Sequence, residues 1–298
     1  MRSLIQPILV ALLVVASDPA FGQKPTEQEE LALTAMEGLM QQSPERALPI
    51  IKKVLAGPQT PLVKKRALFV LSQLETPEAD EILLQTARSP DAAMRREAIR
   101  NIGIGGRDKA LAALQPIYAA GDKDVKEQVL HAWMIAERKQ EVYQVAVNAK
   151  SEEEAAAAIH MLSAMGAVEE LRKLGDRANA TDSLVEAYAV SGDLESLRKI
   201  AEGNADPKLR EEAVRKIGII SDDRARKTLR EIYSRSPDPK IKQAALEGLL
   251  IADDDKGVFE LYKGATTADE KETLLRILTQ MDSELALDAI DHALEGKQ

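Results

Sequence analysis

The sequence contains no cysteine and few aromatic residues. Without cysteine the chain has no disulfide, no thiolate nucleophile and no cysteine-ligated metal. Aromatic residues make up only 3 % of the 298 residues, which is sparse for a single large core. A repeat array tolerates this scarcity because each unit buries small aliphatic side chains against its neighbours.

An excess of basic charge is also missing. The chain has 40 lysine and arginine residues against 49 aspartate and glutamate residues, which gives a formal net charge of −9. An acidic surface with interspersed charges argues against nucleic acid or an anionic membrane as the main partner. The partner that we expect is a protein or peptide of unknown identity, and the sequence does not indicate an oligomeric state.

Familiar catalytic and ligand-binding motifs are absent. The sequence has no HExxH, GxSxG or Walker motif. Residues 103–106 (GIGG) follow no predicted strand, so they do not form a dinucleotide-binding loop. Residues 253–257 (DDDKG) lack the alternating oxygen spacing of a calcium loop and instead predict a turn that caps the next helix. We therefore expect a protein that is not an enzyme, with no catalytic residue, no cofactor and no metal site.

The N-terminus has the pattern of a secretory leader. Arg2 precedes an apolar stretch at residues 8–16, and Ala20 and Gly22 are small residues before a cleavage position. An uncleaved anchor is the alternative, but the apolar run at residues 4–16 is shorter than the roughly 20 residues needed to span a bilayer. The sequence predicts a signal peptide over residues 1–22, cleaved after Gly22, and a periplasmic or secreted mature protein without a membrane anchor.

One helix-forming sequence motif recurs through the rest of the chain, and residues 206–220 are its clearest copy. Asp206 is a good N-cap, and Pro207 suits the first helical position. An apolar stripe at helical spacing then follows: Leu209, Ala213, Val214 and Ile217. The motif predicts a complete amphipathic helix together with its N-terminal cap.

Aligning these helices on their first buried position, called offset 0 below, gives a repeat of roughly 30 residues. The offset-0 residues are Val63, Met94, Val125, Glu154, Thr181, Leu209, Ile241 and Glu270. Offset 8 is large and apolar in all copies but one: Leu71, Ile102, Trp133, Leu162, Ala189, Ile217, Leu249 and Leu278. A further helix lies between consecutive copies, for example over residues 109–118, and no strand-type alternation occurs. The pattern predicts an all-α solenoid of about eight two-helix repeats over residues 45–282. A spacer and N-capping helix (23–44) precede it, and a C-terminal capping helix (283–298) follows it.

The repeats resemble HEAT repeats, and in particular the short HEAT-like units named from phycobilisome (bilin) lyases. The copies that carry the resemblance are Asp206-Pro207-Lys208-Leu209-Arg210 with Ala213 and Gly218, Met94-Arg95 with Ala98 and Gly103, and residues 236–239 with Ala245 and Gly248. The resemblance covers about residues 45–295. It implies a right-handed α-α superhelix whose second helices line the concave side. It does not imply one function, because such repeats serve scaffolds, adaptors and some enzymes.

Exposed positions on the second helices are the candidate functional residues. If offsets 0, 4, 5 and 8 are buried, offsets 2, 6 and 9 face the concavity. Offset 6 is chemically varied, as a recognition surface would be, and comprises Phe69, Arg100, His131, His160, Ala187, Arg215, Glu247 and Arg276. All of these except Ala187 are our candidates for partner binding. Ordinary solvated positions without a ligand are the alternative.

Two finer patterns have alternative readings. His131 and His160 are equivalent in consecutive repeats, but no carboxylate at that offset completes a metal site, so a surface pair is favoured.

Offset 1 is basic in six repeats: Lys64, Arg95, Lys126, Arg210, Lys242 and Lys271. These cations form either an ionic ladder between repeats, with cap carboxylates such as Asp206, or a stripe that binds anions.

Taken together, these features predict a non-catalytic interaction scaffold that works outside the cytoplasm and binds a protein or peptide on its concave face. The alternative is an enzyme or ligand-handling protein similar to the bilin lyases.

Overall fold

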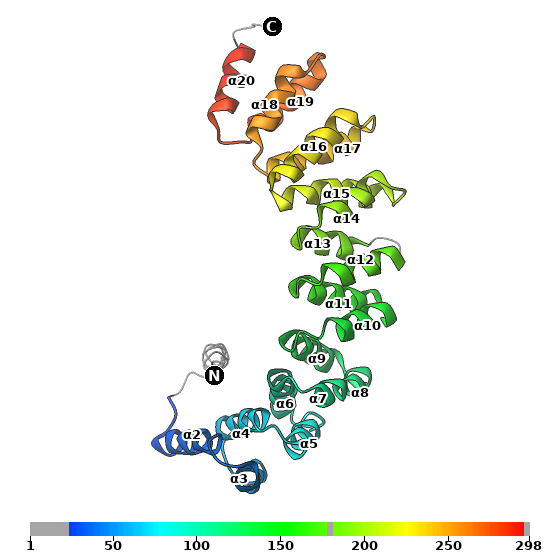
Figure 1. Cartoon of the computed structure of the whole chain (residues 1–298). Helices are drawn as coiled ribbons and strands as arrows, with labels where there is room; N and C mark the ends of the chain where they lie inside the picture. The colour runs from blue at the N-terminus through cyan, green and yellow to red at the C-terminus, as the bar shows by residue number, and fades with distance from the viewer. Residues whose placement is uncertain (1–23, 178–180, 295–298) are drawn as a thin grey trace, which may run out of the picture. The chain divides into compact units, whose positions relative to one another are not determined.

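The structure is a computed structural model that describes residues 24–177 and 181–294, and every regular element in these ranges is a helix. The predicted signal peptide over residues 1–22, with its cleavage position after Gly22, lies outside the described residues. Figure 1 labels the helices and colours them in chain order from blue to red. The chain divides into two compact units, Met1–Ala132 and Trp133–Gln298, which are described separately. The described residues confirm the prediction of an all-α solenoid without strands.

The N-terminal unit holds the first described helices of the chain. They are α2 (Glu27–Leu39), α3 (Pro44–Ala56), α4 (Pro61–Gln73), α5 (Pro77–Thr86), α6 (Ala92–Gly105), α7 (Asp108–Ala112) and α8 (Leu114–Ala120). The division between the units falls inside α9 (Lys123–Ile135). The second helices α4 and α6 pack against each other, and α5 connects them.

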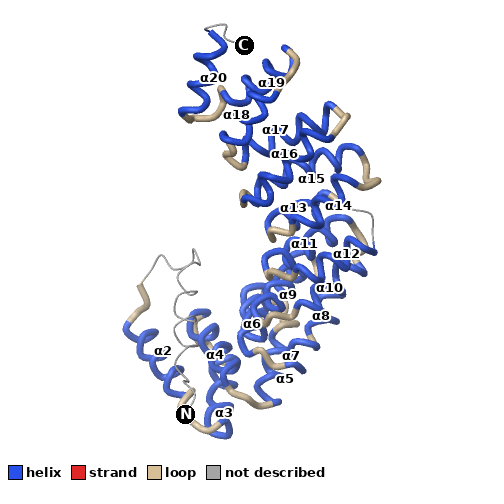
Figure 2. Tube along the Cα trace, turned by 45° about the horizontal axis from the view of Figure 1, so that its top comes forward, coloured by secondary structure: helices blue, strands red, loops and turns tan. Residues whose placement is uncertain are grey.

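The C-terminal unit repeats the same pairing. Its helices are α10 (Lys139–Asn148), α11 (Glu152–Ala164), α12 (Val168–Arg177), α13 (Asp182–Val190), α14 (Leu194–Glu202), α15 (Pro207–Ile220), α16 (Asp223–Arg235), α17 (Pro239–Ile251), α18 (Asp255–Gly264), α19 (Ala268–Leu278) and α20 (Glu284–Leu294). The second helices α11, α13, α15, α17 and α19 each contact the next one, and the first helices alternate with them (Figure 2). One face of each repeat is therefore built by consecutive second helices.

Helix starts follow the predicted cap chemistry. The Asp206 carboxylate accepts a hydrogen bond from the backbone N–H of Lys208 at 2.9 Å, and Pro207 occupies the first turn of α15. Asp91, Asp122 and Asp238 accept from first-turn N–H groups in the same way. These bonds satisfy donors that have no partner within the helix.

The core positions agree with the repeat pattern. Offset 4 is fully buried in every repeat: Ala67, Ala98, Val129, Ala158, Val185, Ala213, Ala245 and Leu274. The offset-8 residues are at most 3 % exposed, and Trp133 is 1 % exposed, as expected of a core residue. Small residues at offset 4 let the helices approach, and large residues at offset 8 fill the space between them.

Six consecutive second helices, from α6 to α17, pass to the next first helix through a residue in the left-handed backbone region. These turn residues are Gly106, Glu137, Gly166, Gly192, Ser221 and Asp253, with φ between 52° and 71°. The turn residue lies fifteen positions after the helix N-cap in most repeats, as from Asp206 to Ser221. From Thr181 to Gly192 the separation is only eleven, so α13 is one turn shorter than its equivalents.

The shortened α13 corrects the predicted register in that repeat. Thr181 is not a buried position, because it is exposed and caps α13 by accepting from the Leu184 N–H at 3.4 Å. Counted back from Gly192, the residue equivalent to offset 6 is Glu186, which is exposed. Ala187, which we predicted there, is only 3 % exposed.

Two other polar residues at offset 0 are also not core residues. The backbone N–H of Glu154 donates to the Ser151 hydroxyl oxygen at 3.2 Å, and the backbone N–H of Glu270 donates to the Thr267 hydroxyl oxygen at 3.3 Å. The side chain of Glu154 reaches back to accept from the N–H of Lys150. These glutamates serve the helix N-terminus, where a carboxylate is favoured.

The prediction that offset 9 faces the open surface is wrong in four repeats, where Ser72, Gly103, Ser163 and Gly218 are buried. It holds at Thr279, which is exposed. A Cβ on Gly103 would lie 2.8 Å from the backbone of Ala132, so the absence of a side chain allows close contact with α9. In these four repeats offset 9 is therefore a packing position.

The helix predicted over residues 109–118 is divided into α7 and α8 at Ala113. Pro116 explains the break, because it has no N–H to bond to the carbonyl of Ala112 and its ring crowds the preceding turn.

Candidate functional site

The predicted row in the N-terminal unit consists of half-buried and exposed side chains with local partners. Phe69 is half-buried, and the guanidinium of Arg66 lies 5.7 Å from its ring centre. Arg100 pairs with Glu97 of the same helix at 3.8 Å. The Arg100 and Glu97 side chains are 32 and 18 % exposed, and a pair three residues apart on one helix contributes only a few tenths of a kcal/mol, so it does not prevent Arg100 from binding a partner.

The two histidines of the row are both exposed. The Nδ1 atom of His131 lies 2.9 Å from the carbonyl oxygen of Glu127 in the preceding turn. Within residues 24–177 and 181–294, no group of three or more histidine, aspartate or glutamate side chains could hold a metal ion.

In the C-terminal unit, Arg215 and Glu247 bind each other. The Arg215 Nε donates to the Glu247 Oε2 at 2.6 Å, which links α15 to α17, and Arg215 also pairs with Glu212. The hydrogen bond to Glu247 raises the pKa of Arg215 against the opposing effect of burial. Burial favours the protonated form of Glu247, but hydrogen bonds from Arg215 and Gln243 outweigh it and lower the pKa of this carboxyl. This part of the row therefore has a structural role between repeats.

Glu186 extends this ion-pair network by one helix. It pairs with Lys216, which also lies 3.8 Å from Glu212. The connected charges run from α13 through α15 to α17. Sequence reasoning missed Glu186, and the left-handed turn that recurs after six second helices is the signal that gives the correct register.

Arg276 differs from Arg215 because its only described partner is local. It donates to Glu272 one turn earlier at 2.7 Å, and both side chains are more than 70 % exposed. Arg276 is therefore the most accessible cation of the row in this unit.

The offset-1 cations contact the end of the first helix in their own repeat. Arg210 donates to the carbonyl of Ala201 at 3.0 Å, and the Lys242 Nζ lies 4.9 Å from the ring centre of Tyr233. Arg95 and Lys126 make the corresponding contacts with Ser89 and Tyr118. A cation is favoured at a helix C-terminus, which offsets its unfavourable place in the first turn of its own helix. Lys242 in addition pairs at 3.9 Å with Glu270 in the first turn of the next second helix, α19, so an ionic contact between repeats occurs at this position, with a first-turn carboxylate rather than a cap.

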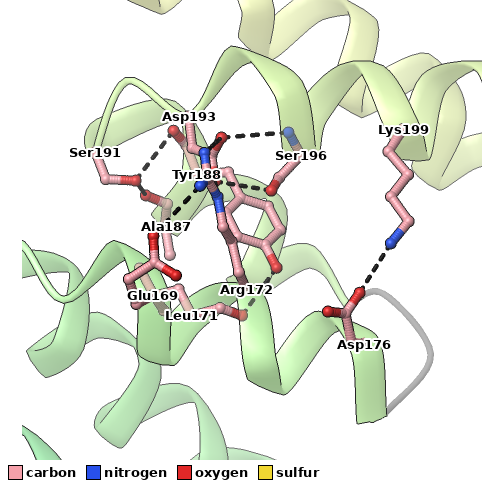
Figure 3. Close-up of polar contacts among 10 residues, drawn as sticks. All are labelled: Glu169, Leu171, Arg172, Asp176, Ala187, Tyr188, Ser191, Asp193, Ser196 and Lys199. Carbon is pink, nitrogen blue, oxygen red and sulfur yellow. Dashed lines mark hydrogen bonds and ion pairs between the residues drawn. The ribbon is translucent and has the colours of Figure 1, made fainter.

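A buried aspartate organises the first helices of the C-terminal unit (Figure 3). Asp193 precedes α14, and its side chain is 1 % exposed. Arg172 of α12 binds it with two parallel hydrogen bonds of 2.8 and 2.9 Å, and the Ser196 hydroxyl donates to it at 2.7 Å. Burial favours the protonated form of Asp193, but the hydrogen bonds from Arg172 and Ser196 outweigh it and lower its pKa.

Tyr188 lies beside this pair and is 3 % exposed. Its hydroxyl donates to the carbonyl of Leu171 at 2.9 Å (Figure 3). Burial and the nearby charge of Asp193 raise the pKa of Tyr188 to about 12. Gly175 leaves room for this hydroxyl, because a Cβ there would lie 2.2 Å from it.

An open cleft borders this cluster. Arg172, Tyr188 and Ser196 line one part, and the start of α15 with Asp206 and Leu209 lines another. Lys199 binds Asp176 across it at 2.8 Å, which raises the pKa of Lys199. The polar groups of the cleft largely satisfy one another, so we assign this cluster a structural role in joining repeats.

Paired helices, recurring caps and a varied row on the second helices define a helical-repeat protein. Residues 48–134 and 194–282 match the family model of HEAT repeats, and these ranges cover more than half of the chain. The chain belongs to the HEAT repeat family. Among the described residues, no helix has the length and apolar character needed to cross a membrane.

Similar proteins include enzymes. The deoxyhypusine hydroxylase of Phaeosphaeria nodorum is 28 % identical over 155 residues, which are 49 % of this chain and 40 % of the relative. The chain thus matches well under two thirds of that relative's length. The structure of human deoxyhypusine hydroxylase in complex with glycerol is 15 % identical and has a TM-score of 0.32, over 76 % of this chain and 99 % of that one. The complex of CpcE and CpcF of phycocyanin lyase from Nostoc sp. PCC7120 is 18 % identical and has a TM-score of 0.33, over 94 % of this chain and 95 % of that one.

These relatives correct one prediction. We expected a protein that is not an enzyme because familiar catalytic motifs are missing. The curated relative with which the chain shares 155 aligned residues is a hydroxylase, so that prediction is overturned. The missing motifs define other enzyme classes and do not exclude catalysis on this fold.

Proposed function

We propose that this HEAT repeat protein holds a protein or peptide partner on the surface formed by its second helices. The observation that supports the proposal is the regular placement of unlike exposed groups. In the C-terminal unit, consecutive second helices pack side by side and each sets one offset-6 side chain on the same face. Imidazole, carboxylate and cationic groups on one face of this unit favour recognition of a specific surface.

Arg100 and Arg276 are the best positions for a test, because among the described residues each forms its ion pair with a glutamate of its own helix. Arg100→Glu and Arg276→Glu reverse charge without breaking a bond between repeats. Arg215→Glu is a poor choice, since it would also break the pair with Glu247. Lys173→Glu and Lys227→Glu on the first helices α12 and α16 make the same charge change elsewhere and serve as controls.

The measurement is affinity capture from the envelope fraction of the native organism, quantified by mass spectrometry. We expect the Arg100→Glu, Arg276→Glu double variant to lose most of a partner that the wild type and the control double variant retain. Equal capture by all three proteins would remove this surface from consideration.

We also propose that the mature protein acts outside the cytoplasm. The support is the leader-like pattern of residues 1–22 in the sequence. Cell fractionation and N-terminal sequencing test it. A mature protein that begins at Gln23 and is found in the periplasm or medium supports export, and a cytoplasmic protein that retains Met1 contradicts it.

An enzymatic function is the second candidate, and the similarity to a deoxyhypusine hydroxylase favours it. The test is incubation of the purified chain in air, with a chemical reductant, with a protein that carries deoxyhypusine, followed by mass spectrometry for one added oxygen atom; O2 supplies that atom and the reductant converts the other to water. No product with or without added divalent metal would reject this activity. A bilin-lyase-like role is tested separately, because a bound chromophore would give the purified protein visible absorbance.

A further inference from the structure

A column of exposed aliphatic side chains crosses the C-terminal unit. Each member lies at the end of a second helix, two positions before the left-handed turn residue that follows it. The column consists of Ile135, Ala164, Val190, Ile219 and Ile251. The four larger side chains are 44, 62, 40 and 49 % exposed.

The regular placement distinguishes this column from ordinary surface apolar residues. Single exposed aliphatic side chains are common and need no explanation. Here the same structural position is aliphatic in five consecutive repeats. Contacts of α13 with α11 and α15, and of α15 with α17, place Ala164, Val190, Ile219 and Ile251 in successive positions along one face. These four residues form one apolar strip.

The strip is bordered by a surplus of negative charge. One turn before Val190, Ile219 and Ile251 lie Glu186, Arg215 and Glu247, the ends and centre of the ion-pair network. Glu186, Glu212 and Glu247 contribute three carboxylates to this network, and Arg215 and Lys216 contribute two cations. The carboxylate side chains are 34 to 48 % exposed, whereas the cation side chains are 24 and 33 % exposed. A partner on the strip therefore meets mainly negative charge.

We propose that this strip binds an amphipathic α-helix with an apolar face and basic residues along one flank. Packed helices lie about 8–10 Å apart, so each repeat advances the column by about that distance. Residues seven apart on a helix are separated by about 10.5 Å, which matches one apolar contact per repeat. The basic flank complements the exposed carboxylates. This inference rests on the proposed partner-binding function and names the chemistry of its partner.

The test uses a fluorescein-labelled synthetic helix of about 21 residues with leucine at every seventh position and lysine on one flank. The variant Ile219→Ser, Ile251→Ser removes two neighbouring members of the column and, because both are exposed, leaves the fold intact. Leu287→Ser in α20 removes an aliphatic side chain that is 60 % exposed and lies outside the column, so it is the control. We expect at least tenfold weaker binding to the double variant by fluorescence anisotropy, and unchanged binding to the control.

Charge provides the second arm. A peptide with glutamate in place of the flanking lysines is expected to bind at least threefold more weakly, and this difference should shrink as salt screens the carboxylates. Equal binding of both peptides, equal binding by the double variant, or no binding of either peptide overturns the proposal. Two further outcomes would assign the strip to another occupant. In both, neither peptide binds, and the wild type either self-associates in sedimentation experiments or binds anionic lipid vesicles. Loss of that behaviour in the double variant would identify a second copy of the chain or a lipid surface as the occupant.

The native partner separates this inference from the function on which it rests. If Arg276→Glu abolishes capture of the native partner and the Ile219→Ser, Ile251→Ser variant does not, the strip is not the binding site and the proposed function stands. If neither variant changes capture, both the strip and the proposed function are rejected.

Discussion

Gly218 of α15 lies directly against Gly248 of α17. A Cβ built on Gly218 would stand 2.3 Å from the carbonyl oxygen of Gly248 and 2.9 Å from its Cα. Both contacts are with backbone, which cannot move aside as the end of a flexible side chain can. The two second helices therefore approach as closely as they do because neither has a side chain at this point.

Gly218→Ala is expected to destabilise the protein by about 1–3 kcal/mol, because the added methyl group must push α15 away from α17. The expected sign is informative, since alanine normally favours a helix over glycine by about 1 kcal/mol. Gly38→Ala in α2 is the matched control, because a Cβ there meets nothing within 4 Å and should leave stability equal or slightly higher. Urea unfolding of both variants measures the difference, and a stabilised Gly218→Ala would contradict the close packing.

The Arg172–Asp193 pair should be strongly asymmetric to mutation. Asp193→Ala leaves the partly exposed Arg172 able to reach water but removes the cap of α14, with an expected cost of about 1–3 kcal/mol. Arg172→Ala leaves a carboxylate that is 1 % exposed without its cation and should cost about 3–5 kcal/mol. A double-mutant cycle by chemical denaturation measures the coupling. Additive single effects would show that the two residues act independently.

Alkaline pH should weaken the C-terminal unit through Tyr188. Its pKa is about 12 in the folded protein against an ordinary value of 10.0, so the unfolded chain releases this proton first. The stabilising contribution of the neutral phenol is therefore complete below about pH 10 and is lost as the pH rises towards 12. Wild type should lose more stability than Tyr188→Phe across this window in urea titrations at stepped pH. Tyr262→Phe, at a half-buried position, is the control. Parallel pH slopes for wild type and Tyr188→Phe would contradict the shift.

Glu137→Gly should raise stability by about 1 kcal/mol. Glu137 has φ 55°, a left-handed conformation in which its Cβ is crowded, and three equivalent turns use glycine instead. Gly192→Ala is the reciprocal change at φ 71° and should cost about 1 kcal/mol, although a Cβ there meets nothing within 4 Å. Thermal unfolding compares the two variants with wild type. A destabilised Glu137→Gly would mean that the contacts of the glutamate side chain outweigh the backbone strain.

The correct sequence predictions depend on local chemistry. Asp206 and Pro207 mark the start of α15 because capping involves only the first turn. The burial of Ala213 and Ile217 follows from helical spacing, because side chains four apart share a face. The candidate row was chosen by the same spacing, so its exposed members, such as Arg276, were within reach of the sequence.

The sequence by itself determined the helical repeat, its period, its caps and its core positions, because each depends on residues within one helix. Only the tertiary structure decided that Arg215 is bound to Glu247 and that Gly103 and Gly218 at offset 9 pack against the next second helix. These features depend on the distance between neighbouring helices and on which side chains meet across it. A pattern within a single helix carries no information on that distance, because residues about 30 positions away set it.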